Sequence, residues 1–285
     1  PLSVADLDRL KRFYGMGDPF WVQYAKWLRQ LVAGDLGFSL TYRVGVGDLL
    51  WPALGRTLVL TGAAFLIGIA GAMILGIRSA LKAGSPDDRF IRLLSYLGIS
   101  IPTFWLCLVM IQLFSVRWRW FPPDAQFLPQ ETQGFGWVNS LVLPVITLAI
   151  PLIAEWVRYV RSGFLTVLTA DYIRAARARG ISEGRILWAH VLPNGLVPFL
   201  TILGLSLPNL VGGELVVEMV FGWPGLGQLE YNAVREQDHS VAMAALLLVA
   251  AATLFGSLLA DLAHAWLDPR IRSGILRETD WRKNP

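Results

Sequence analysis

Few residues of this sequence have the types and spacing that catalysis requires. It contains no G-x-x-x-x-G-K-[ST] loop to hold phosphates, no G-x-S-x-G nucleophile elbow and no H-E-x-x-H zinc-binding helix. The three histidines, His190, His239 and His264, are too scattered to predict a metal cluster by spacing. We therefore expect this chain to have no catalytic residues, no metal site and no cofactor of its own.

Four carboxylates lie in apolar segments or near their ends, where ionised groups are expensive and by default indicate function. Glu214 and Glu218 are four residues apart, so they should share one helical face. They could line an outer vestibule that attracts a cation, or contact a partner protein. Glu155 precedes Arg158 by three residues, so a local ion pair is the simpler interpretation. Asp261 is expected to pair with an arginine of the C-terminal tail.

A basic segment, DYIRAARARGISEGRILWAHVLPNGLVP, has the pattern of two short helices separated by a glycine. Asp171 and Ser182 are predicted N-caps, Gly180 a left-handed stop, and Leu192-Pro193 the end of the second helix. Its alanines leave a face of small side chains that another protein could approach, and its arginines offer charge-assisted contacts. The predicted contact residues are Asp171, Arg174, Ala175, Ala176, Arg177, Gly180, Ser182, Leu192 and Pro193. A loop that touches only lipid headgroups is the alternative.

A second distinctive segment, FGWPGLGQL, contains Trp223, Pro224 and Gly225. Proline and glycine set the backbone angles of tight turns, so we predict a turn between two helices here. A simple connector without further function is the alternative.

The composition indicates the elements that must hold these segments. Hydrophobic residues make up 54% of the 285 residues and charged residues only 16%, against about 25% in soluble proteins. A helix needs roughly 20 apolar residues to cross about 30 Å of hydrocarbon. We therefore predict an all-α integral membrane protein with five transmembrane helices, kinked at internal prolines. The expected spans are Leu58–Ile77, Leu93–Val116, Leu141–Tyr159, Leu196–Phe221 and Val241–Leu267.

The arginines and lysines indicate an orientation, because short cytoplasmic loops of membrane proteins carry an excess of them. They concentrate in residues 78–92, 158–185 and 270–283, whereas the alternate loops have few. The net charge of +4 is explained by this topology, without a nucleic-acid partner. We expect an external amphipathic segment at 1–55, a transmembrane domain at 56–267 with a cytoplasmic loop at 164–193, and a cytoplasmic tail at 268–285.

The loop around Gly180 resembles the EAA motif, by which permease subunits of ABC importers dock a coupling helix on their ATPases. Ala175, Ala176, Gly180, Leu192 and Pro193 occupy matching positions. Arg174 replaces the initial glutamate of the general motif and His190 replaces a later isoleucine. Both departures are typical of the dipeptide, oligopeptide and nickel permease branch. That branch is also similar to this chain in GDLGFSL at 34–40, FGWPGLGQL at 221–229 and DPRIR at 268–272.

The resemblance implies a permease subunit in a bacterial or archaeal inner membrane, with lipid around it. It implies a homologous second permease, two cytoplasmic ABC ATPases that bind ATP and Mg, and a periplasmic or extracellular substrate-binding protein. Peptides are the first expected cargo, with nickel or other small solutes as alternatives. The turn at Trp223 would lie near the outer gate. Members of this branch usually begin with one further membrane helix, giving six, and it is absent here.

Two other classes of protein remain as alternatives. A proton-coupled secondary transporter would use Glu155, Glu214, Glu218 or Asp261 as proton carriers. A non-transporting membrane receptor or assembly subunit would bind no ATPase.

Overall fold

The computed structural model describes residues 18–125, 136–212 and 214–267, which are mostly helical. The expected tail motif DPRIR and residues 1–17 of the expected amphipathic segment lie outside these residues, and so does the side chain of Asp261. The elements are α2 (Phe20–Val32), α3 (Val46–Leu81), α4 (Pro86–Ser100), α5 (Thr103–Met110), the π-helix η1 (Ile111–Arg117), α6 (Gly136–Leu168), α7 (Asp171–Ala178), α8 (Glu183–Ile186), the π-helix η2 (Leu187–Val191), α9 (Leu192–Gly195), α10 (Val197–Ser206), α11 (Asn209–Gly212), α12 (Leu215–Val220), α13 (Leu226–Arg235) and α14 (His239–Leu267).

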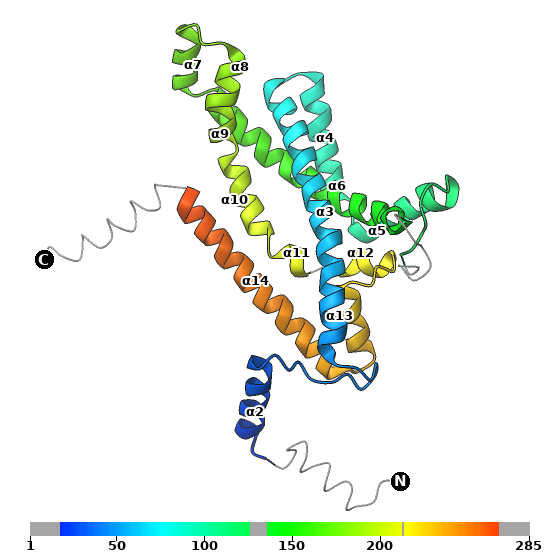
Figure 1. Ribbon diagram of the computed structural model, residues 1–285. Coiled ribbons are helices and arrows are strands. Elements are labelled where there is room, and N and C mark those ends of the chain that lie inside the picture. Colours follow the sequence, from blue (N-terminus) through cyan, green and yellow to red (C-terminus); the bar gives the residue numbers. More distant parts are fainter. Residues whose placement is uncertain (1–17, 126–135, 213, 268–285) are drawn as a thin grey trace, which may run out of the picture.

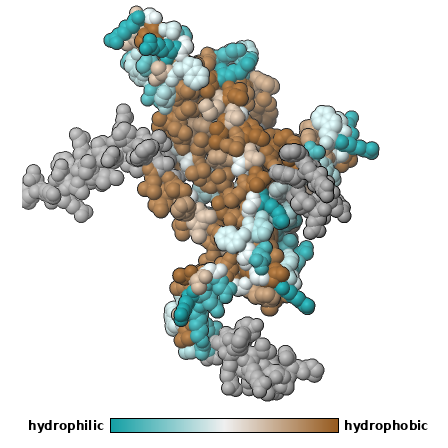
Figure 2. All heavy atoms as spheres, in the orientation of Figure 1, coloured by the Kyte–Doolittle hydropathy of each residue, from teal (hydrophilic) through white to brown (hydrophobic). Residues whose placement is uncertain are grey.

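The helices form an elongated bundle (Figure 1), and on the face drawn in Figure 2 hydrophilic residues gather at its two ends. Helices α7 and α8 lie at one end with the turn between α3 and α4, and we call this the α7 end. Helix α2 and the turn between α13 and α14 lie at the opposite end, which we call the α2 end. Figure 2 shows that apolar residues cover the middle of the molecule on this face. An apolar middle between polar ends fits a chain that crosses a bilayer.

Three helices of the described residues are long and apolar enough to span a membrane: Val46–Leu81, Val138–Leu168 and His239–Leu259. The number rises to five if each of two bent helix pairs counts as one span. In the first pair, α4 is followed by α5 and η1, and the chain bends by 103° next to Pro102. In the second pair, Glu183–Gly195 is followed by Val197–Gly212, and the bend is 40°. The second expected span is thus a helix broken at Pro102, where no backbone N–H is present to continue it. The fourth expected span is divided into α10, α11 and α12, and the 40° bend lies at its first residue.

The central contact of the bundle is between α3 and α6, and small residues of α3 make it possible. A β-carbon at Gly68 would stand 2.9 Å from the ring of Trp156. A β-carbon at Gly76 would stand 2.6 Å from Val160 and 3.1 Å from the carbonyl oxygen of Val157. Small residues at intervals of four allow membrane helices to approach closely. The buried stripe on α3 comprises Ala64, Gly68, Ala72, Gly76 and Ala80.

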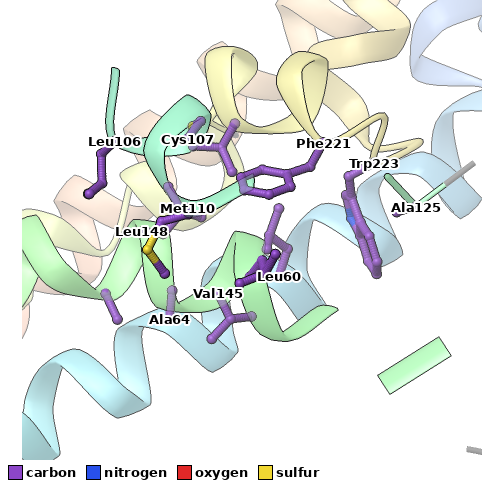
Figure 3. Packing of buried hydrophobic residues seen from close by; sticks show 13 residues of the cluster. Leu60, Ala64, Leu106, Cys107, Met110, Ala125, Val145, Leu148, Phe221 and Trp223 are labelled. Carbon is purple, nitrogen blue, oxygen red and sulfur yellow. The ribbon is translucent and has the colours of Figure 1, made fainter. Parts of the chain in front are cut away.

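A second core lies where α3, α5, α6 and the segment after α12 meet (Figure 3). Phe221 and Trp223 pack there with Leu60 of α3 and Leu148 of α6. Cys107 of α5 is fully buried in the same cluster, as a small apolar filler. This core fixes the segment after α12 against the long helices.

The α2 end is tied together by one buried carboxylate. Asp238, at the turn before α14, accepts hydrogen bonds from the hydroxyl of Ser39 and from the backbone N–H groups of Thr41 and Val241. Burial opposes its charge, but these hydrogen bonds outweigh burial and hold the pKa of Asp238 below its usual value. The GDLGFSL segment is therefore attached to the start of α14.

We expect Gly76→Ala to destabilise the protein, because the added methyl group would collide with Val160 and the Val157 carbonyl. Overpacking of this kind costs about 1–3 kcal/mol, which exceeds the gain of up to about 1 kcal/mol in helix propensity. Gly62→Ala is the matched control, since a β-carbon there has nothing within 4 Å on the same helix. Thermal unfolding in detergent measures both variants. A Gly76→Ala protein as stable as Gly62→Ala would contradict the close α3–α6 contact.

We expect Asp238→Asn to lower the free energy of unfolding at pH 7 by about 1–3 kcal/mol, because the charged acceptor of three hydrogen bonds is lost. The folded pKa is depressed, so this stabilisation is present above the unfolded value of about 3.9 and disappears as pH falls through the folded pKa. Unfolding midpoints measured from pH 7 to pH 3 should therefore converge for the two proteins. Asp35→Asn, which changes an exposed carboxylate of the same segment, should keep the wild-type pH profile.

Candidate functional site

The segment singled out by its basic pattern forms a helical hairpin at the α7 end, which we call the α7 hairpin: α7, the turn at Gly180, and α8. Gly180 has a φ of 76°, so it is the left-handed stop that the sequence predicted. Ile173 of α7 and Ile186 of α8 are almost fully buried, and they join a core with Phe164 and Val191. These two isoleucines fix the hairpin to α6 and to the helix that follows it.

The hairpin exposes most of the predicted contact residues, namely Asp171, Arg174, Ala175, Arg177, Gly180 and Ser182. Ala176 is different, because it is half-buried and packs against the core around Ile173. The small-residue face therefore consists of Ala175 and Ala178, without Ala176.

The two predicted contact arginines form ion pairs within the hairpin. Arg177 donates to both carboxylate oxygens of Glu183, at 2.7 and 3.2 Å, and so connects α7 to α8 across the Gly180 turn. Arg174 lies 3.4 Å from Asp171, one helical turn away. Exposed pairs of this kind contribute about 1 kcal/mol or less, so a protein partner could replace them at little cost.

Two local predictions for this segment were wrong, and the predicted N-cap at Ser182 was confirmed in position only. The N-cap of α7 is Ala170, and Asp171 is the first helical residue, where its charge still suits the helix N-terminus. Ser182 is the N-cap of α8, but its side chain makes no capping hydrogen bond. The helix also does not end at Leu192-Pro193. It continues through the π-helix η2 into α9, which contains Pro193.

A buried carboxylate that the sequence reasoning missed joins three helices near the hairpin. Asp88, at the start of α4, accepts hydrogen bonds from Arg161 of α6 at 2.7 and 2.9 Å. It also accepts from the hydroxyl of Ser79 in α3 at 2.6 Å and from the N–H of Gly84 at 2.9 Å. The sequence contains no signal to distinguish Asp88 from the adjacent Asp87, because both residues follow a proline at the start of a helix. The α3–α4 turn is thus joined to the part of α6 that leads into the hairpin.

Glu218 does not line an open vestibule, contrary to one interpretation of the sequence. It is fully buried, and its carboxylate accepts hydrogen bonds from Thr57 Oγ1 at 2.6 Å and from the N–H of Gln228 at 3.0 Å. A β-carbon at Gly225 would stand 2.3 Å from Glu218 Oε1, so the segment after α12 needs glycine to fold over this carboxylate. Glu218 therefore holds this segment in place.

The turn containing Trp223, Pro224 and Gly225 is correspondingly anchored. Trp223 is 2% exposed, and its Nε1–H donates to the carbonyl of Arg56 at 3.1 Å. Arg56 in turn donates to the carbonyl of Pro224 at 3.3 Å. These contacts fix the turn to α3, so it is more than a loose connector. Whether it belongs to a gate stays a prediction.

Glu214 is exposed whereas Glu218 is buried, although the two are only four residues apart. It precedes α12 and lines a cavity of about 260 Å³ between α3, α6, α10 and α11. Glu155 of α6 lines the same cavity, and the expected ion pair with Arg158 is not among the contacts of the described residues. Thr61, Thr103 and Asn209 add polar groups. Binding sites of many transporters lie where membrane helices are discontinuous, as α10, α11 and α12 are here.

Comparisons with known proteins agree with this architecture. The sequence pattern of the family described as "Binding-protein-dependent transport system inner membrane component" matches residues 68–273. The chain is 39% identical over 272 residues to the oligopeptide transport system permease protein AppB of Bacillus subtilis, covering 95% of this chain and 86% of that protein. It is 33% identical over 291 residues to the dipeptide transport system permease protein DppB of Alkalihalophilus pseudofirmus, with the same two coverages.

A solved structure of the MetNI methionine ABC transporter in inward-facing conformations is also similar in fold. The TM-score is 0.61 at 20% sequence identity, and the match covers 77% of this chain and 96% of that chain. At this identity the likeness concerns the fold alone.

We expect Asp88→Asn to lower the free energy of unfolding by about 3 kcal/mol or more, because it leaves Arg161 without its buried counter-charge. Asp87→Asn is the matched control: Asp87 is exposed and pairs with Arg78 and Lys82, so its loss should cost about 1 kcal/mol or less. Thermal unfolding of both variants in detergent makes the comparison. Equal losses would show that Asp88 is not the connection between these helices.

Proposed function

The chain belongs to the family of binding-protein-dependent transport system inner membrane components, and from this premise we propose that it is the permease subunit of an ATP-driven peptide importer. Similarity to peptide permeases over 95% of the chain supports peptides as the cargo. As a permease the chain is not itself catalytic, so the energy must come from ATPase partners. A homologous second permease, two ABC ATPases and an external substrate-binding protein would complete the assembly.

The observation that carries this proposal is the α7 hairpin. It lies at one end of the apolar body (Figure 1), exposes two alanines between paired arginines, and is anchored to the core by Ile173 and Ile186. A rigid, polar hairpin at the end of a membrane bundle suits docking on a soluble partner. We assign it the role of the coupling helix that seats in an ATPase.

The orientation follows from the same surface. The basic residues at 78–92 and at 174–185 lie at the α7 end in Figure 1, and cytoplasmic segments carry such an excess. In this orientation the α7 end faces the cytoplasm and the α2 end faces the outside. The multi-pass chain would then lie in the inner membrane, with its ATPases against the α7 hairpin and its binding protein at the α2 end.

The connections of the hairpin explain how an ATPase could move the permease. Only Thr169 and Ala170 separate α7 from α6, and α8 continues through η2 and α9 toward α10. Helices α6 and α10 line the cavity that contains Glu155 and Glu214. A displacement of the hairpin is therefore carried to both sides of that cavity. ATP binding favours one of two conformations by its different affinity for each, and alternating access would follow.

Two measurements on the purified protein test this function. Co-expression with its predicted partners should yield a detergent-stable complex that contains an ATPase pair. In proteoliposomes, peptide uptake should require ATP and persist when the proton gradient is collapsed. Uptake that needs the proton gradient and survives ATP depletion would support a secondary transporter instead, and the absence of any ATPase from the complex would support a receptor.

We expect Gly180→Val to reduce peptide uptake strongly while the protein still inserts into the membrane. A β-branched residue is strongly disfavoured at a φ of 76°, so the turn would rearrange and misplace α7 against α8. Gly180→Asn is the control at the same position, because asparagine tolerates left-handed backbone and should keep most of the uptake. ATP hydrolysis, ATPase copurification and uptake are measured for both. Wild-type uptake by Gly180→Val would refute the coupling role of this turn.

A further inference from the structure

The cavity of about 260 Å³ contains two carboxylates from distant parts of the chain. Glu155 reaches it from α6, and Glu214 reaches it from the break between α11 and α12. Among the described residues, neither carboxylate accepts a side-chain hydrogen bond or forms an ion pair. Glu218 shows the contrast, because its oxygens are occupied by Thr57 and Gln228. Of the three carboxylates in this region, Glu218 therefore has hydrogen-bond donors, whereas Glu155 and Glu214 have none among the described side chains.

An ionised carboxylate within a membrane protein is expensive without a partner, and such groups face the protein interior or a water-filled path and mark the route of a substrate or ion. Both carboxylates line the same cavity and are exposed in this chain, so a cationic group that enters the cavity can reach them. An ammonium group has three donors and no acceptor, which matches carboxylate oxygens. The chemistry of the cavity thus favours a cation as its occupant.

The remaining walls define what else that occupant contains. The hydroxyl of Thr61 is already used, because it donates to the carbonyls of Thr57 and Leu210. The side chain of Asn209 is available as both a donor and an acceptor, as a peptide group requires. Phe65, Leu148 and Leu152 supply apolar walls. An ammonium group next to amide and apolar groups is the composition of a short peptide.

We propose that Glu155 and Glu214 form this subunit's part of a transient cargo site, where they bind an ammonium group of the peptide as it crosses the membrane. The inference rests on the proposed function and deepens it, since it names the chemical group that the path recognises. The ammonium group belongs either to the amino terminus of the peptide or to a lysine side chain. Both present the same charge and donors, and the experiment distinguishes them.

The test uses the complete assembly in proteoliposomes with its binding protein and ATP, and it measures uptake of trialanine and of alanyl-lysyl-alanine. We expect the double variant Glu155→Gln/Glu214→Gln to lose about tenfold or more in trialanine uptake, as loss of one ion pair of about 1.4 kcal/mol would give. Recognition of the amino terminus predicts the same loss for both peptides. Recognition of a lysine side chain predicts a larger loss for alanyl-lysyl-alanine.

Controls separate charge recognition from a structural role. The double variant Glu155→Asp/Glu214→Asp keeps both charges and should recover most of the uptake. Glu236→Gln removes an exposed carboxylate at the α2 end and should leave uptake unchanged. ATPase copurification should be the same in every variant, because none of these residues lies in the α7 hairpin. Basal hydrolysis should be unchanged in Glu236→Gln, which lies outside the proposed site.

Three outcomes would overturn the inference. Wild-type uptake of both peptides by the double Gln variant would show that the carboxylates bind no cargo. Loss of the second permease from the purified complex would show that they pair with that subunit. If the wild-type assembly hydrolyses ATP but imports neither peptide, the proposed function itself fails and the inference fails with it.

Discussion

Helix α3 can lie directly against α6 because every fourth residue along its buried side is small, and the other elements depend on that contact. Lipid chains are as apolar as leucine, so burial of apolar surface gives little drive for helices to associate within a bilayer. Close packing must supply it, and Gly68 and Gly76 allow Trp156 and Val160 to approach the α3 backbone. Both the α7 hairpin and the cavity are attached to this pair of helices, since α6 leads into α7 and α3 lines the cavity.

Polar contacts then fix the ends of this apolar pair. At the α7 end, Asp88 joins α3, α4 and α6 through Arg161 and Ser79. At the α2 end, Asp238 joins the GDLGFSL segment to α14. Each carboxylate is buried with nearly all of its hydrogen-bonding capacity filled, which is the condition for a buried charge to persist. Rigid ends are what a permease needs if a force applied at the hairpin is to reach the cavity as a movement of whole helices.

The sequence predicted the class of fold and the position of the hairpin, because apolar runs and the Gly180 turn are local signals. It predicted kinks at prolines inside the spans, Pro102 among them, but not that the chain bends there by as much as 103°. A hydropathy profile reports how apolar a segment is and not the direction of its helix axis, so it gives no measure of a bend. Nor did it distinguish Asp88 from Asp87, since the difference lies in Arg161, 73 residues along the chain. Ala176 was placed on the exposed face although it follows the buried Ile173 by three residues, a spacing that puts both on one side of a helix.

Glu214 and Glu218 show most clearly what the three-dimensional structure adds to the pattern. Helical spacing placed them on one face, with one shared role. In the structure Glu218 accepts hydrogen bonds from Thr57 of α3 and from the backbone N–H of Gln228, whereas Glu214 lines the cavity with Glu155. The break before α12 separates the two, because Glu214 lies outside the helix that contains Glu218. The break in the helix therefore puts two carboxylates with the same spacing signal in different surroundings: Glu218 is hydrogen-bonded in the interior, and Glu214 lines the cavity. Irregular backbone at such a break is tolerated in a membrane protein only where it is buried in protein or lines a cavity.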